Sequence, residues 1–207
     1  MPEQSSVHAY LNWTKQRIDE MDATLASLEA RGSQAKAASK EKADQIFADL
    51  KKLRDDFQAG TKAQAQAGET TLQAGKAQLE SQWRGFESQI RSYFDTAGRQ
   101  VEQEQATFRD VVAAQAKAWG DATEKFHAEA ANIAAARRDD LEAAVKQMQA
   151  DGAEAEARLQ KLKQAGSESW VSLSAALAES RKAFDRANQQ VADAFKAATP
   201  EGTRSTG

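Results

Sequence analysis

The chain has 207 residues, and 28 basic against 31 acidic residues leave a formal net charge of only −3 at pH 7. Charges of both signs are interspersed, so no region is basic enough to neutralise nucleic-acid phosphates or to hold anionic lipid through a polybasic cluster. The absence of cysteine excludes disulfides and thiol chemistry, and two histidines leave little for metal-assisted or nucleophilic catalysis.

Alanine and the lack of internal proline predict helix along nearly the whole chain. Forty-four residues are alanine, and the two prolines, Pro2 and Pro200, lie at the ends. An interior proline costs a helix about 3 kcal/mol, whereas Ala, Gln, Glu, Lys and Arg are strong helix formers. Large apolar residues are too sparse for a thick globular core but sufficient for the narrow seam of packed helices. Without a signal peptide or a membrane-spanning stretch, we expect a cytoplasmic protein.

The first helix is expected over residues 6–59, which leaves residues 1–5 as a disordered N-terminus. Apolar residues recur within it at steps of mostly three and four, as on one face of a helix, and Gly32-Ser33 is a candidate break. The pattern weakens between Gln58 and Gly75. A hairpin turn is expected there, over Gly60–Glu69.

A second helix is expected over residues 69–150. Four of its large residues follow one another at heptad spacing: Val112, Trp119, Phe126 and Ile133. The phase shifts after Ile133, which indicates a stutter that locally unwinds a supercoil. The heptads run through Gly120 and favour a continuous helix there. Because a helix of about 80 residues would reach about 120 Å, beyond its shorter neighbours, we expect either a kink near Gly120 or self-association.

A third helix is expected over residues 153–198, after a turn at Asp151-Gly152 and before a disordered tail over 199–207. The predicted fold is therefore all-α: an extended antiparallel coiled coil or bundle of three to four long helices, forming one domain over 6–198.

A weak internal repeat suggests that this domain arose by duplication. Asp49–Phe57 resembles Asp140–Met148, and Glu80–Phe86 resembles Ser167–Leu173. A duplicated unit of about 90 residues, with copies at 7–98 and 99–198, explains both matches. Biased composition explains them equally well.

Large aromatic residues in phase with the apolar pattern are candidates for the packing seam or for an interface. They are Trp13, Trp83, Phe94, Phe108, Trp119, Phe126, Trp170 and Phe184. Exposed Trp and Phe on an amphipathic helix can also insert into a lipid or polymer surface. The seam is favoured, because Ala and Gln fill most flanking positions where insertion would require a wider apolar face.

Metal and cofactor sites are not expected. Glu124 and His127 match the Glu-x-x-His half-site of di-iron bundles, but the other histidine, His8, follows Ser5 at the corresponding spacing, so the second half-site is missing. The glycines form no phosphate-binding loop, and the carboxylates lie on faces of alternating charge that are typical of solvated surface. We therefore expect no cofactor and no enzymatic activity.

The C-terminal helix carries the pattern small-Trp-x-x-Leu-x-x-Ala at Ser169–Ala176, followed by Phe-Asp-x-Ala at Phe184–Ala187. This pattern resembles that of small bacterial coiled-coil stress-response proteins of a type first described in cyanobacteria. The resemblance implies a cytoplasmic, non-enzymatic helical protein associated with stress, and it supplies no functional residues.

The leading hypothesis is thus a non-catalytic structural or interaction protein that assembles with itself as a homo-oligomer and does not bind nucleic acid. An alternative is an amphipathic protein that coats a lipid or polyester-granule surface, as phasins and apolipoproteins do. A third is a desiccation protectant that is disordered in water.

Overall fold

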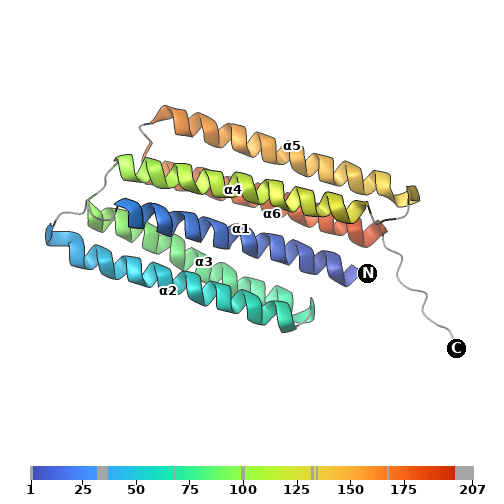
Figure 1. Cartoon of the computed structure of the whole chain (residues 1–207), viewed down its shortest axis with the longest axis horizontal. Coiled ribbons are helices and arrows are strands. Elements are labelled where there is room, and N and C mark those ends of the chain that lie inside the picture. Colours follow the sequence, from blue (N-terminus) through green and yellow to red (C-terminus); the bar gives the residue numbers. More distant parts are fainter. Residues whose placement is uncertain are drawn as a thin grey trace.

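A computed structural model of the chain shows an elongated bundle of antiparallel helices (Figure 1). The structure describes residues 2–31, 37–67, 69–98, 101–131, 133, 135–166 and 168–198. These residues form six helices and no strand: α1 (Pro2–Arg31), α2 (Ala37–Ala67), α3 (Glu69–Ala97), α4 (Val101–Ala130), α5 (Ala135–Ala165) and α6 (Trp170–Ala198). The predicted all-α bundle is confirmed, but the helices are shorter and more numerous than the three to four expected.

Two turns that the sequence analysis did not place divide the expected helix 69–150. α3 ends at Ala97 and α4 ends at Ala130, so this range holds α3, α4 and part of α5. Gly98 follows α3 with a φ of 87°, and Gly166 follows α5 with a φ of 68°. Glycine adopts this left-handed conformation without a Cβ clash and commonly ends helices for that reason.

The stutter predicted after Ile133 is a helix end instead. α4 stops at Ala130, and the amide of Ile133 donates a hydrogen bond of 3.1 Å to the carbonyl of Ala130 in the connection to α5. Gly120 lies within α4, so the helix is continuous there as the heptads indicated. Each helix holds 29 to 31 residues and is about 45 Å long, so neighbours match in length and no 80-residue helix protrudes.

The turn predicted at Asp151-Gly152 is wrong, because both residues lie inside α5. A Cβ on Gly152 would lie 2.9 Å from Cε3 of Trp119, so glycine there lets α5 approach the indole of α4. Gly60 lies inside α2, where a Cβ would lie 3.0 Å from Cδ2 of Leu79. Of the turn expected over Gly60–Glu69, residues 60–67 are helical, α3 begins at Glu69, and residue 68 lies outside the described residues. Both glycines mark close contacts between helices.

The ends of the bundle agree only in part with expectation. α1 begins at Pro2, earlier than the start expected at residue 6. α6 ends at Ala198, directly before Thr199-Pro200, as predicted. Gly32-Ser33 and the tail over 199–207 lie outside the described residues.

α1 lies in the middle of the bundle, where it packs against α2, α3, α4 and α6 (Figure 1). α2 and α3 form one antiparallel hairpin, α5 and α6 form another, and α4 joins α1 to the second. One apolar cluster combines α1, α2 and α3 with the first halves of α4 and α6 and with Leu159 of α5. A second cluster lies between the later part of α4, α5 and α6. Large apolar residues thus concentrate in two places instead of along one continuous seam.

Helix lengths repeat between the two halves of the chain. α1, α2 and α3 hold 30, 31 and 29 residues, and so do α4, α5 and α6. Asp22-Ala23-Thr24 in α1 and Asp121-Ala122-Thr123 in α4 stand equally far from the starts of their helices. The passages paired in the sequence analysis do not: Trp83 lies in the middle of α3, whereas Trp170 opens α6. Duplication stays a prediction. The order of the helices pairs α1, α2 and α3 with α4, α5 and α6, which is a different alignment from the one proposed from the sequence.

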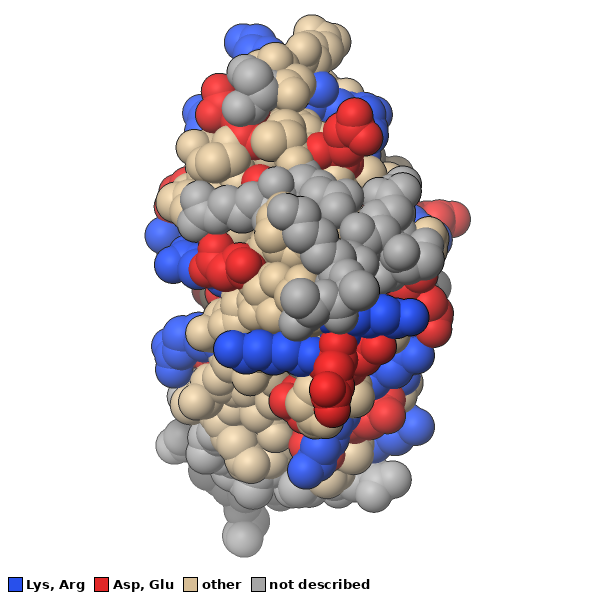
Figure 2. Space-filling model, turned by 90° about the vertical axis from the view of Figure 1, so that its left-hand side faces the viewer, with Lys and Arg blue, Asp and Glu red and all other residues tan. Residues whose placement is uncertain are grey.

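The surface is polar and mixed in charge. Figure 2 shows Lys and Arg interspersed with Asp and Glu over the end of the bundle where α4 and α6 begin. Among the described residues, the large apolar side chains that remain exposed are Leu11, Val101 and Val171. None of the described helices is both long enough and apolar enough to cross a lipid bilayer.

Candidate functional site

One face of α1 is polar and yet buried in the middle of the bundle. Its residues recur at steps of four, four, four and three, and each is no more than 4% exposed: Asn12, Gln16, Glu20, Thr24 and Ser27. Steps of three and four place side chains on one side of a helix. We call this face the polar stripe of α1. Its contacts with α4 and α6 form the joint between the two halves of the molecule.

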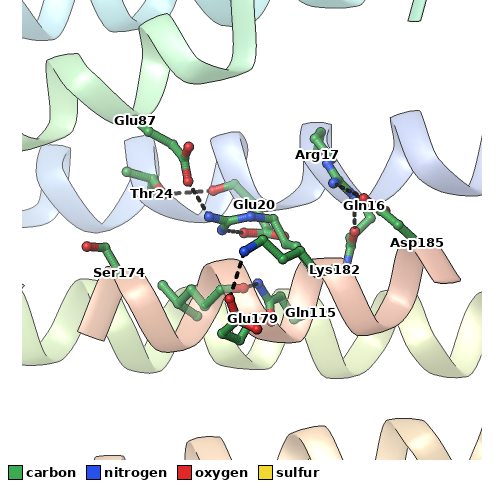
Figure 3. A network of polar contacts seen from close by, with 12 residues as sticks. Gln16, Arg17, Glu20, Thr24, Glu87, Gln115, Ser174, Glu179, Lys182 and Asp185 are labelled. Carbon is green, nitrogen blue, oxygen red and sulfur yellow. Dashed lines mark hydrogen bonds and ion pairs between the residues drawn. The ribbon is translucent and has the colours of Figure 1, made fainter. Parts of the chain in front are cut away.

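The centre of the stripe is a cluster of charges (Figure 3). Arg181 of α6 donates from Nη1 to Oε2 of Glu20 at 2.8 Å, and its other amino group contacts Glu87 of α3. Arg17 donates from both amino groups to Asp185 of α6, at 2.8 and 2.7 Å. Forked pairs of this kind are among the strongest polar contacts in proteins. We call these five residues the charge cluster; it ties α6 to α1 and to α3.

Burial makes this cluster a demanding arrangement. Both arginine side chains are 7% exposed and that of Glu20 is 1% exposed. Burial raises the pKa of Glu20 above its ordinary value, and the positive charges of Arg181 and Arg17 oppose this shift. Removing one member of a buried pair strands the other charge away from water, which costs about 3–5 kcal/mol. The cluster therefore fixes where α6 docks, because another register would leave charges unpaired.

Amides extend the polar joint on both sides of the cluster. Asn188 of α6 accepts a hydrogen bond from Asn12 at 3.3 Å and donates to the carbonyl of Ala9 at 2.7 Å. Gln115 of α4 donates to the carbonyl of Leu177 at 3.2 Å. α1, α4 and α6 are thus linked by directional contacts that apolar packing alone would not supply.

The start of α6 is held by side chains of α4. A carboxylate oxygen of Glu104 accepts a hydrogen bond from the amide of Trp170 at 2.8 Å, and Gln105 donates to the carbonyl of Glu168 at 3.1 Å. The first amides of a helix lack partners within it, so a carboxylate is favourable there. This role explains the burial of Glu104 and Gln105, whereas Thr107 is buried beside Ser27 of α1 and Phe108 lies in the first apolar cluster.

Two hollows flank the joint. The first is a groove of about 740 Å³ between α4 and α5, with Trp119 and Met148 among its apolar residues and Glu124, His127 and Glu156 among its polar ones. Small residues line much of the rest: Ala116, Gly120, Ala128, Ala131, Gly152 and Ala153. We call it the α4–α5 groove.

The second hollow is a cleft of about 470 Å³ between α3 and α6, which we call the α3–α6 cleft. Trp83 and Ile90 line it from α3, and Trp170 and Leu177 line it from α6. Glu20 and Arg181 of the charge cluster also border it, so this cleft leads from the surface to the polar joint.

All eight aromatic candidates from the sequence are buried, at no more than 8% exposure. Those in the first apolar cluster are Trp13, Trp83, Phe94, Phe108 and Trp170, and those in the second are Trp119, Phe126 and Phe184. The rings of Phe94 and Trp170 lie 4.9 Å apart, and those of Trp119 and Phe184 lie 5.1 Å apart. Trp119 also borders the α4–α5 groove, and Trp83 and Trp170 border the α3–α6 cleft. These three residues pack in the core and can also be reached by a molecule that enters the hollows.

The histidines fall at unrelated positions. Glu124 and His127 line the α4–α5 groove, whereas His8 lies 2.6 Å from a carboxylate oxygen of Glu129. Within the part of the chain that the structure describes, no three His, Asp or Glu side chains converge as a metal site would require.

The polar stripe of α1 and its partners are the residues that sequence reasoning missed. A polar face that recurs with helical periodicity normally indicates solvent exposure. A signal was present in the residue types: Asn12, Gln16, Thr24 and Ser27 are neutral, unlike the Lys, Glu and Asp of the exposed faces. No protein-family model, curated protein or solved structure matches this chain.

Proposed function

We propose that this protein is a non-catalytic interaction protein of the cytoplasm, associated with stress, and that it assembles with a second copy of itself through the α4–α5 groove. The groove carries the proposal, because it is the largest hollow among those described and opens onto the buried residues Trp119 and Met148.

The corresponding region of the first half is closed. Met21, Leu25 and Leu28 of α1 are buried against α2. The residues equally far along α4 are Gly120, Glu124 and His127. These small or polar residues leave a hollow in the second half that aliphatic side chains fill in the first.

A second copy suits this surface for two reasons. Small residues along both helices allow close approach of another helix pair, since the distance between packed helices depends on the side chains at the contact. The two helices also carry exposed charges of both signs, with Lys125 following Glu124 on α4 and with both Lys146 and Glu156 on α5. A self-complementary contact about a two-fold axis requires such a mixed surface.

Light scattering during size-exclusion chromatography of the full chain tests the proposal. We expect a dimer that Gly120→Phe converts to a monomer, because the new ring would fill the groove. A Cβ at Gly120 meets nothing within 4 Å, so the bundle itself is not crowded. Gly85→Phe on α3 is the matched control, since a Cβ there also meets nothing. A wild-type monomer at high micromolar concentration would overturn the proposal, as would equal loss of the dimer in both variants.

The association with stress is supported by the resemblance of the C-terminal helix. Survival of a deletion strain after heat, desiccation or oxidant exposure tests it. Unchanged survival under all three would remove the stress association and leave the assembly proposal intact.

The surface-coating alternative requires the bundle to open. Most of its large apolar residues are buried. Those exposed in the described ranges are one leucine and two valines: Leu11, Val101 and Val171. Co-sedimentation with anionic vesicles or polyester granules is the deciding measurement, because all four tryptophans are already buried and their emission would change little. Circular dichroism in dilute buffer addresses the desiccation hypothesis, which full helicity would contradict.

A further inference from the structure

The α3–α6 cleft has the shape of a binding site for a small molecule. α3 and α6 both pack on α1, and the cleft separates them. Its volume of about 470 Å³ lies within the range typical of ligand pockets, about 300–1,000 Å³. Trp83 and Trp170 border it on its two sides together with Ile90 and Leu177. The guanidinium of Arg181 lies 4.9 Å from the centre of the Trp83 ring.

Two arginines at this cleft have no ion-pair or hydrogen-bond partner among the described residues. Arg84 and Arg91 lie seven residues apart on α3, hence on one side of the helix, and both are exposed and border the cleft. Neither takes part in an ion pair or side-chain hydrogen bond with the described residues, whereas Arg17, Arg54 and Arg181 all do. A guanidinium group matches the two oxygens of a carboxylate or sulfonate, so this pair is suited to an anion.

Other charges in the cleft do not cancel this attraction. Glu20 and Glu87 are both contacted by the one guanidinium of Arg181. The cleft holds three arginines against two glutamates, and its free positive charges are the two that face solvent.

Apolar surface continues from the cleft toward the end of the bundle. A smaller hollow of about 190 Å³ shares Arg91, Trp170 and Val171 with the cleft. It adds the apolar residues Phe94 and Val101 and the carboxylates Asp95 and Glu104, of which Glu104 is already bonded to the amide of Trp170. Val101 is 49% exposed and Val171 is 53% exposed, and these are two of the three large apolar side chains exposed in the described ranges. Exposed apolar surface therefore gathers beside the unpaired arginines.

We propose that the α3–α6 cleft binds a small amphiphile with one anionic group, such as a medium-chain carboxylate. The anionic group contacts Arg84 and Arg91, and the apolar part lies between Trp83 and Trp170. The charge of Arg181 is taken by Glu20 and Glu87, so it holds the two helices apart at a fixed distance and does not bind the ligand.

Fluorescence titration of the full chain with 8-anilinonaphthalene-1-sulfonate tests this site, because the probe joins an aromatic body to a sulfonate. We expect one site per chain from which decanoate displaces the probe. Decyltrimethylammonium, which has the same chain length and the opposite charge, should displace it poorly. If decanoate and decyltrimethylammonium displace the probe equally well, apolar contact alone holds it, and the proposal is overturned.

Variants locate the site. Arg84→Gln with Arg91→Gln should weaken probe binding about tenfold or more, since two charge-assisted contacts are lost. Arg109→Gln with Arg186→Gln removes the same charge from exposed positions outside the cleft and should change binding less than about twofold. Equal weakening by both pairs would mean that overall charge drives binding.

A third variant keeps the charges and fills the space. Ala175 is exposed and borders the cleft, so Ala175→Trp should abolish binding with unchanged helicity by circular dichroism. Gly120→Phe fills the α4–α5 groove instead and should leave the probe bound. The opposite pattern would place the probe in the α4–α5 groove and refute the site, without bearing on the dimer.

Discussion

The two halves of the molecule use the same helix lengths to build different interiors. Trp83 of α3 and Phe184 of α6 are equally far from the starts of their helices, and both are buried. Leu50 of α2 and Met148 of α5 correspond in the same way. The halves diverge on the first helix of each, where α1 fills its contact with α2 and α4 leaves a groove beside α5. A few positions thus decide whether a shared framework is closed or open.

The last helices of the two halves also differ. Arg181 of α6 is buried in the charge cluster, whereas Glu80, equally far along α3, is exposed. Asn188 of α6 is buried against α1, and its counterpart Glu87 lies beside the α3–α6 cleft. α6 is therefore bound into the centre through polar groups, and α3 lies against α1 with its charged face toward solvent.

The largest expected effect tests this central position of α6. Arg181→Met leaves the buried carboxylate of Glu20 without its main partner and removes the contact with the partly exposed Glu87, so we expect the free energy of unfolding to fall by about 3–5 kcal/mol in urea titrations. Glu80→Met, at the matching position of α3, should change it by less than about 0.5 kcal/mol.

A double variant separates charge from packing in the same position. Adding Glu20→Leu to Arg181→Met should recover most of the loss, because no buried charge on α1 then lacks a partner. If Arg181→Met alone changes stability no more than Glu80→Met does, the charge cluster does not organise the joint.

The next effect distinguishes two helix glycines that the sequence alone makes equivalent. Gly152→Ala should destabilise by about 1–2 kcal/mol, because the new methyl group would crowd the indole of Trp119. Gly120→Ala should instead stabilise by about 0.5–1 kcal/mol, since its Cβ has open space and alanine favours helix. Urea unfolding of both variants measures the two signs. Stabilisation by both would mean that α5 does not approach Trp119 closely.

These glycines also show what could be derived from the sequence. Helix over nearly all of the described residues, an end at Ala198 and continuity at Gly120 follow from propensity and periodicity, and the structure has all three. Gly98 and Gly166 end helices while Gly60 and Gly152 lie inside them. That distinction depends on which helix lies opposite each glycine, and local sequence does not contain it.

The site was harder to derive for a related reason. Periodicity identifies the polar stripe of α1 as one face, but whether that face meets water or another helix depends on the order of packing. Placing α1 in the middle buries both of its faces, the apolar one against α2 and the polar one against α4 and α6. The eight aromatic residues were easier to find, because large apolar side chains are buried wherever the helices pack.

A pH-dependent effect follows from the stripe. The pKa of Glu20 is raised by burial, and the groups facing it are Arg181 and Arg17. A raised pKa in the folded state means that this carboxyl favours folding below its ordinary pKa of 4.5, and that the contribution is lost as the pH rises through the folded value. The stability of the wild type relative to Glu20→Gln should therefore fall as the pH rises above 4.5. Urea unfolding of both proteins across that range measures it, and a constant difference would contradict the shift.

The smallest effect returns to the two halves, through a pair of matching aspartates. Asp22 of α1 lies 2.8 Å from Arg54, and burial raises its pKa. Asp121, equally far along α4, contacts Lys117 and Lys15, and these contacts lower its pKa. Both side chains are partly exposed, so each effect should stay below about 1 kcal/mol.

The signs of the two contributions are opposite. Asp121 stabilises the fold above its ordinary pKa of 3.8, and this contribution is lost as the pH falls through its lower pKa in the folded state. Asp22 stabilises the fold below 3.8, and its contribution is lost as the pH rises through its higher pKa in the folded state. On acidification the wild type should therefore lose stability relative to Asp121→Asn and gain it relative to Asp22→Asn. Carboxyl titration by NMR at low salt measures both pKa values directly. Shifts of the same sign would show that the two halves place these aspartates in equivalent surroundings, and the divergence would then be confined to the groove and to the charge cluster.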